Sequence, residues 1–136
     1  MQDTQSRDIT LVFKPWRAKE VCDTCNDYHE GFELLCNGEL IEGVSEPHGS
    51  IAYVWDLIAK QLFKHLRVDV QVLETKVFDA SGTHTLRVEH EGKSFRRRVV
   101  WYDDEVPGEK GLAFLRQALT FVGFDPTIEV SELEKI

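Results

Sequence analysis

Cysteines are few in this chain of 136 residues, basic residues are fewer than acidic ones, and long hydrophobic runs are lacking. No apolar run approaches the roughly 18 residues of a membrane-spanning helix, so we expect no membrane partner. Sixteen Lys and Arg residues stand against 24 Asp and Glu residues, which leaves a formal net charge of −8. Because such a field repels phosphate backbones, we expect no nucleic-acid partner either.

The sequence also bears on the cellular compartment and on catalysis. The first fifteen residues hold no apolar segment after a basic start, as a secretory signal peptide would. The three cysteines are an odd number, and together these features favour reduced thiols in a cytoplasmic protein. With 42% hydrophobic and 29% charged residues, the composition is that of an ordinary globular domain. No catalytic motif stands out, so we expect a protein that is not an enzyme.

The chain is predicted to form one domain over residues 9–124, with polar segments at both ends. Residues 1–8 are predicted to be a flexible N-terminus, and residues 125–136 are predicted to be an acidic tail. Apolar and polar residues alternate over residues 9–16, which predicts the first strand. Pro15 suggests that this strand ends there or lies at a sheet edge.

Turn residues predict two hairpins. Asn37-Gly38 is the favoured pair for a two-residue type I′ turn, and such a turn would pair Leu35 with Leu40. A second hairpin is expected around residues 91–93, where a glycine separates two apolar-patterned segments. Both turns would make their flanking strands antiparallel neighbours.

Two amphipathic helices complete the pattern. Apolar residues recur at steps of three and four over residues 50–66 and over residues 111–122. Ser50 fits the N-cap of the first helix. The predicted order is therefore three strands and a helix, followed by the same again. Strands grouped before each helix predict an α+β fold with antiparallel sheets and helices on one face.

Four residues in the N-terminal half have side chains that bind zinc: Cys22, Cys25, His29 and Cys36. Two cysteines separated by two residues can chelate one ion, and the other two side chains would complete a tetrahedral site. The spacing matches no standard zinc finger, however, and Cys36 shares its strand face with apolar residues, as a buried thiol would. We therefore favour plain reduced cysteines and no cofactor, with zinc as the alternative.

Two segments carry a resemblance to a known family. They are residues 38–42 (GELIE), which lead to Gly49 and the first helix, and residues 86–96 (LRVEHEGKSFR), which lead to the second. In element order and spacing, residues 9–122 resemble the C-terminal regulatory domain of 2-isopropylmalate and citramalate synthases. The resemblance implies two units of three strands and a helix, pairing with a second copy, and binding of an end-product amino acid. The family's catalytic barrel has no counterpart in this sequence.

The resemblance also implies a ligand site at the turns before the two helices. The corresponding residues in this sequence are His48, Gly49, Ser50, Asp103 and Asp104. Only Gly49 matches the family's Gly-x-Gly-Pro turn, and an acidic loop replaces the family's Asp-Ile-Ile-x-Ala-Ser segment. Binding of leucine or isoleucine is therefore not carried over to this chain.

We accordingly expect a non-enzymatic cytosolic module that forms a homodimer and binds a small ligand or a partner protein. The dimer is expected because two helices cannot cover all of the large apolar side chains, and exposed apolar patches usually mark interfaces. Two alternatives remain: a zinc-supported interaction protein, and an acidic inhibitor or adaptor of a basic partner protein. The second alternative is motivated by the net charge of −8 alone.

Overall fold

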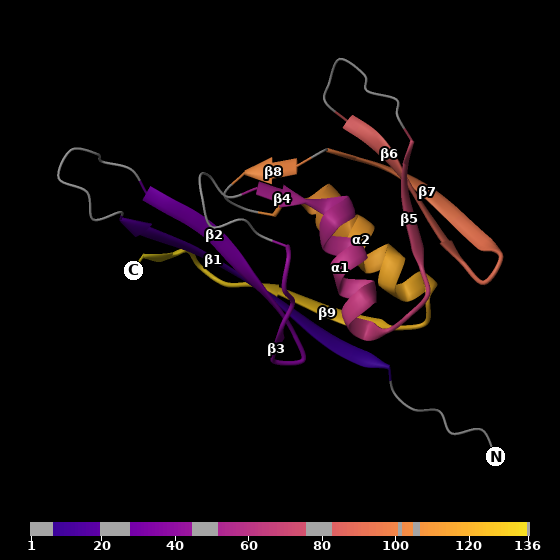
Figure 1. Cartoon of the computed structure of the whole chain (residues 1–136), viewed down its shortest axis with the longest axis horizontal. Coiled ribbons are helices and arrows are strands. Elements are labelled where there is room, and N and C mark those ends of the chain that lie inside the picture. The colour runs from indigo at the N-terminus through magenta and orange to yellow at the C-terminus, as the bar shows by residue number, and fades with distance from the viewer. Residues whose placement is uncertain are drawn as a thin grey trace.

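A computed structural model describes residues 7–19, 28–44, 52–75, 83–100, 102–104 and 107–135. Two β-sheets pack with two helices, which lie between them in Figure 1. One sheet is five-stranded and mixed, the other is three-stranded and antiparallel, and a separate pair of short strands precedes the two helices. The predicted α+β class is confirmed, with one short strand added before each helix and two strands added after the second.

The five-stranded sheet is built around its first strand. Its members are β1 (Asp8–Lys19), β2 (Tyr28–Cys36), β3 (Glu39–Leu40), β9 (Asp125–Val130) and β10 (Glu134–Lys135). β1 runs antiparallel to β2 on one side and parallel to β9 and β10 on the other. Ile9, Leu11 and Phe13 alternate with more exposed residues and are buried, as the sequence pattern predicts.

Pro15 neither ends β1 nor marks an edge, so that prediction was wrong. The Thr10 carbonyl accepts from the Asn37 amide on the β2 side, at 2.9 Å. The Phe13 carbonyl accepts from the Ser131 amide on the other side, also at 2.9 Å. Because main-chain groups alternate in direction along a strand, the nitrogen of Pro15 faces the side of β9 and β10. Pro15 lies between Phe13, the last residue of β1 that pairs with β9, and Trp16, the first that pairs with β10. The N–H group that proline lacks is therefore not needed for a hydrogen bond between strands.

Residues 7–8 and 125–130 belong to the fold, although the sequence predicts a flexible N-terminus and an acidic tail there. Residues 125–130 form β9 instead of part of an acidic tail, with Ile9 opposite Pro126 and Leu11 opposite Ile128. The Arg7 guanidinium lies 4.0 Å from the centre of the Phe124 ring, so residue 7 is held against the helix end that leads to β9. Acidic residues on the outer face of β9 make this segment resemble a polar tail, so the sequence pattern does not predict the strand.

The three-stranded sheet consists of β5 (Gln71–Thr75), β6 (Thr83–His90) and β7 (Lys93–Val100). Both predicted hairpins are confirmed. The pair Asn37-Gly38 has φ angles of 50° and 82° and sets Leu35 opposite Leu40. The second turn is the two-residue pair at 91–92, with φ angles of 50° and 78°, and it joins β6 to β7.

The helices are α1 (Trp55–Leu66) and α2 (Glu109–Phe121). α1 starts five residues later than predicted, because β4 (Ala52–Val54) takes up the preceding segment and pairs with β8 (Tyr102–Asp104). The residue that caps α1 is therefore Val54, without a side-chain hydrogen bond, and not Ser50. An aromatic and a β-branched residue in β4 favour the extended conformation that this pairing uses.

The core is centred on four aromatic rings. The ring centre of Phe13 lies 5.9 Å from that of Phe32, 6.0 Å from that of Tyr53 and 6.1 Å from that of Trp55. These residues come from β1, β2, β4 and the first turn of α1, so the cluster ties the five-stranded sheet to the helix layer. Edge-on and tilted contacts at these distances add to the free energy of apolar burial.

Burial predicts how stability changes at alkaline pH. Burial raises the pKa of the Tyr53 hydroxyl and that of the Cys36 thiol, with Glu39 adding to the effect at Cys36. Between the ordinary pKa values, about 8.5 for Cys and 10 for Tyr, and the raised ones, the unfolded chain loses protons that the folded chain keeps. We therefore expect the free energy of unfolding to fall as pH rises through this window. Urea unfolding from pH 8 upwards measures this slope, and Tyr53→Phe should flatten its upper part.

Candidate functional site

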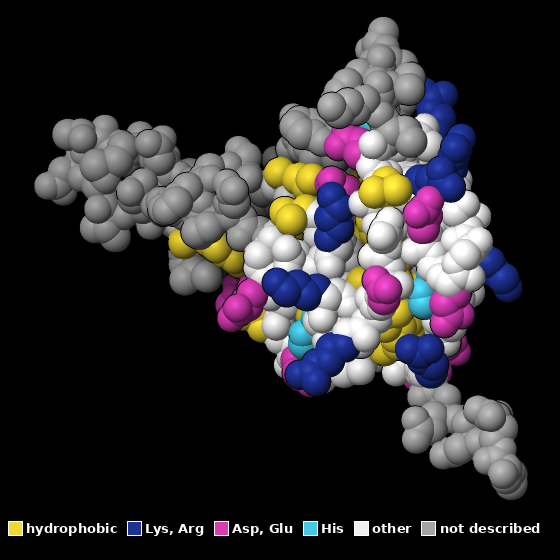
Figure 2. Space-filling view, turned by 45° about the vertical axis from the view of Figure 1, so that its right-hand side comes forward, with side chains coloured by type: hydrophobic (Ala, Val, Ile, Leu, Met, Phe, Trp, Pro, Cys, Tyr) yellow, Lys and Arg dark blue, Asp and Glu magenta, His cyan; other side chains and the backbone are white. Residues whose placement is uncertain are grey.

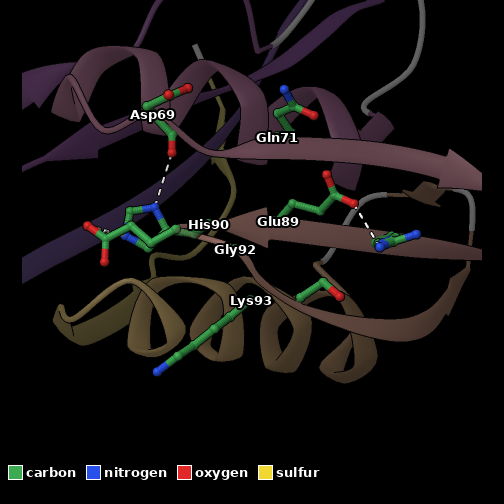
Figure 3. Close-up of a pocket in the computed structure, with 9 residues that line it drawn as sticks. Asp69, Gln71, Glu89, His90, Gly92 and Lys93 are labelled. Carbon is green, nitrogen blue, oxygen red and sulfur yellow. Dashed lines mark hydrogen bonds and ion pairs between the residues drawn. The ribbon is translucent and has the colours of Figure 1, made fainter.

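A polar pocket of about 300 Å³ lies at the end of the three-stranded sheet, beside the β6–β7 turn (Figure 3). Its walls come from all three strands and from the segment before β5. The lining residues are Asp69, Gln71, Arg87, Glu89, His90, Glu91, Gly92, Lys93 and Ser94. The tight turn is what brings the end of β6 and the start of β7 to one place.

A cross-strand row forms the centre of this pocket. The pairing registers place Gln71 directly opposite Glu89, and Glu89 directly opposite Ser94. Directly opposite residues share a face of the sheet, so an amide, a carboxylate and a hydroxyl stand side by side. In the described part of the chain, neither Gln71 nor Ser94 makes a side-chain hydrogen bond. The row therefore offers hydrogen-bonding groups that the protein itself does not use.

His90 closes the turn end of the pocket. Its Nδ1 lies 3.1 Å from the main-chain oxygen of Asp69, a contact that Figure 3 marks. A carbonyl oxygen can only accept, so Nδ1 carries the proton and, in the neutral ring, Nε2 is left as an acceptor. The nearest carboxylate oxygen to Nε2 belongs to Glu91, at 3.7 Å. This nitrogen is thus held in a fixed orientation by the main chain before β5.

Arg87 closes the opposite end. Its Nη2 lies 2.9 Å from Glu89 Oε1, and both side chains are about one-third exposed. Its Nε is buried, and among the described residues it has no hydrogen-bond partner. The pocket therefore carries charges of both signs: Asp69, Glu89 and Glu91 against Arg87 and Lys93. In Figure 3, however, the Lys93 side chain points away from Glu89, towards α2.

Ser94 is the hydroxyl residue among those that line the pocket. Nucleophilic catalysis needs a hydroxyl or thiol within hydrogen-bond reach of a base. Within the described ranges, the Ser94 hydroxyl has no hydrogen bond to His90 or to a carboxylate. The described residues also contain no group of three His, Cys, Asp or Glu side chains that could hold a metal ion. What remains is a cavity with donors and acceptors on strands that hold them in place.

The structure describes only part of the ligand site that the resemblance implies. His48, Gly49 and Ser50 lie outside the described residues. Asp103 and Asp104 lie in β8, opposite Tyr53 and Ala52 of β4. Asp103 and Asp104 are therefore strand residues, and a ligand site formed with His48, Gly49 and Ser50 stays a prediction.

The zinc candidates are only in part within the described structure. Cys22 and Cys25 lie outside it, and His29 is placed through its main chain, which pairs with Ala18. Cys36 is 2% exposed, has a free thiol and belongs to the apolar core. This confirms the prediction of a buried thiol for Cys36, and burial raises the pKa of that thiol. Zinc binding by the four residues together stays a prediction.

The predicted partners of the basic run on β7 differ from those observed. For the basic run of Lys93, Arg96, Arg97 and Arg98, the sequence favours pairing across strands with Glu89 and Glu91, with a clamp for an anion or carboxylate as the alternative. Glu89 instead pairs with Arg87 on its own strand, at 2.9 Å. Arg96 lies opposite Arg87, and the Nη1 of Arg97 donates to Gln117 Oε1 of α2, at 2.8 Å. The two-residue turn fixes this register, so the turn length alone could have revealed it.

Comparisons of this chain with protein-family models, with curated proteins and with solved structures found no match. The resemblance to the synthase regulatory domain therefore stays a prediction. Within the described residues, the helices span 12 and 13 residues, and neither is long and apolar enough to cross a membrane.

Proposed function

We propose that this chain is a non-catalytic module that binds a small polar ligand in the pocket beside the β6–β7 turn. The observation that carries the proposal is the cross-strand row of Gln71, Glu89 and Ser94, whose outer members have unused hydrogen-bonding groups. Arg87 and His90, on the same strand as Glu89, close the pocket at its two ends. A cytosolic setting belongs to the same proposal, because Cys36 is kept as a free thiol in the core.

The pocket chemistry indicates the class of ligand. Glu89 accepts hydrogen bonds, Ser94 both donates and accepts, and the Gln71 amide does both through separate atoms. Charges of both signs stand within one cavity of about 300 Å³. A small molecule with donors and acceptors close together, such as a zwitterion or a polyol, matches this set. A purely apolar ligand would leave these polar groups buried and unpaired, which costs free energy.

The ligand site is tested by nuclear magnetic resonance titration of the isotope-labelled chain. Zwitterions, dicarboxylates and polyols at millimolar concentration serve as probes. We expect at least one class to shift the amide signals of Gln71, Glu89 and Ser94, and Glu89→Gln to weaken that binding at least tenfold. Glu129→Gln, an equal change on exposed β9, should leave it unaltered. Absence of any shift at these amides with all three classes contradicts the proposal.

A second copy of the chain is the partner we propose for the outer face of the five-stranded sheet. Val12, Leu35 and Leu40 lie opposite one another across β1, β2 and β3, which makes an apolar row on that face. Leu40 is 48% exposed. Beside the row, Lys14 lies opposite Glu33, and both are exposed. A twofold pairing would cover the row and set each lysine near the glutamate of the second copy.

The dimer is tested by sedimentation equilibrium at micromolar protein. We expect twice the chain mass of 15.7 kDa for the natural sequence and the single mass for Leu40→Glu. Leu73→Glu is the matched control, because Leu73 is 42% exposed on the other sheet and should leave the dimer intact. A single mass for the natural sequence contradicts the pairing and leaves the ligand site untouched.

A further inference from the structure

The free edge of β7 is a second surface, which shares only Lys93 and Ser94 with the lining of the small-ligand pocket. In the described part of the chain, β7 pairs with β6 alone and is the last strand of its sheet. The two-residue turn makes His90 and Lys93 a hydrogen-bonded pair, so from there hydrogen bonding to β6 alternates along the strand. The main-chain groups of Ser94 and Arg96 therefore face the open edge.

A groove runs beside this edge. It has a volume of about 480 Å³ and lies between β7 and one face of α2. Its lining residues are Arg97, Ala113, Arg116, Gln117, Thr120 and Phe121. The five residues from α2 recur at helical spacing, so they form one stripe. Phe95 packs edge-on against Phe121 at 4.9 Å between ring centres and gives the groove an apolar end.

The groove and the edge are basic, although the chain as a whole carries a charge of −8. Both charged residues in the groove lining are arginines, and the sequence of β7, KSFRRRVV, contains no acidic residue. Arg96 and Arg98 are exposed on the outer face of the strand, and Arg97 lies on the groove side. In Figure 2, Lys and Arg side chains lie along the upper right margin of the molecule, on the side of this sheet.

The basic charge of the groove and the edge indicates which kind of strand could pair with β7. A second β7 would set its own arginines against these, and like charges directly opposite destabilise a strand pair. An acidic segment gains from the same charges. An extended strand presents alternate side chains to its two faces, so one set would meet Arg96 and Arg98 and the other would enter the groove. Strand addition of this kind is a recurring mode of peptide recognition.

We infer that the edge of β7 binds an acidic extended peptide of a partner protein, which adds as a fourth strand to the β5–β6–β7 sheet. Acidic residues at alternate positions contact Arg96 and Arg98. Apolar residues at the intervening positions lie in the groove over Thr120 and Phe121. The main chain of the peptide bonds to the open-edge groups of Ser94 and Arg96.

The test uses a fluorescent blocked heptapeptide of alternating glutamate and valine, with fluorescence anisotropy as the readout. We expect saturable binding that weakens at least tenfold in the double variant R96E/R98E. The variant K60E/K135E makes the same change in net charge away from β7 and should bind within twofold of the natural chain. Thr120→Trp, which fills the groove from an exposed helix position, should also weaken binding.

Two further probes separate strand addition from simple charge attraction. One peptide carries an N-methyl group on its central valine and another carries it on the adjacent glutamate, so each keeps the charge but loses one main-chain donor. Alternate amides of an added strand face β7, so one of the two should bind at least tenfold more weakly than the parent peptide. Hydrogen exchange at the amides of Ser94 and Arg96 should slow when the parent peptide binds. Undiminished binding of both N-methylated peptides, unchanged exchange at these amides, or tighter binding of single-stranded DNA of equal charge would overturn the inference.

Discussion

Removal of β9 should leave a chain that does not fold. A chain that ends at Phe124 lacks the six residues that pair in parallel with β1 from Asp8 to Phe13. It exposes the open side of a central strand that carries three fully or nearly buried residues: Ile9, Leu11 and Phe13. Each lost ladder hydrogen bond costs about 0.5–1.5 kcal/mol, and each newly exposed large apolar side chain costs about 1.5–3 kcal/mol. The sum is comparable with the whole stability of a domain, roughly 5–15 kcal/mol.

Circular dichroism and urea unfolding of the shortened chain measure this effect. We expect no cooperative transition. The matched control ends at Leu133 and removes only β10, whose two residues are exposed and pair with two residues of β1. That chain should unfold cooperatively, within about 1–2 kcal/mol of the natural one. A cooperative transition of normal size in the chain that ends at Phe124 would show that β9 is an accessory strand.

The hairpins and helices could be predicted from the sequence because their signals are local. The pair Asn37-Gly38 adopts positive φ angles, and the strand register follows from the turn length. The buried face of α1 follows from apolar spacing, and Ile58, Ala59 and Leu62 are indeed buried. These features need only neighbours in the chain, which the sequence displays.

β9 and the start of α1 could not be predicted, because distant partners decide both. β9 is a strand because β1, more than 100 residues earlier, presents an open parallel edge to it. β4 interrupts the expected helix because β8 lies opposite Tyr53. Helical spacing of apolar residues over 50–54 is also compatible with a short strand, and pairing selects between the two.

The candidate pocket was missed for a related reason. Gln71, Glu89 and Ser94 are unremarkable residues in three separate segments, and only the register of two strand pairs sets them side by side. The turn at 91–92 fixes the pairing of β6 with β7, so the position of Ser94 opposite Glu89 could be predicted from the sequence. The pairing of β5 with β6 has no such local signal in the described residues, since β5 is short and its alternation is weak.

Gly111→Ala should destabilise the protein, although the same change inside an exposed helix usually stabilises it. Gly111 lies in the first turn of α2, is buried, and has an ordinary helical backbone. A Cβ atom built on it would overlap the Trp55 indole ring, at the Cε2, Nε1 and Cζ2 atoms. In a helix, alanine is favoured over glycine by roughly 1 kcal/mol. Here overpacking costs about 1–3 kcal/mol or more, because a fully buried ring has nowhere to move.

The net expectation for Gly111→Ala is a loss of more than about 1 kcal/mol in the free energy of unfolding, measured in urea. A double-variant cycle with Trp55→Leu identifies the cause. Removing the indole ring opens the space that the new methyl group needs, so Gly111→Ala should be neutral or stabilising in the Trp55→Leu background. If Gly111→Ala costs the same in both backgrounds, its effect does not come from Trp55. The close approach of α2 to α1 at this glycine would then not be what fixes the packing of the two helices.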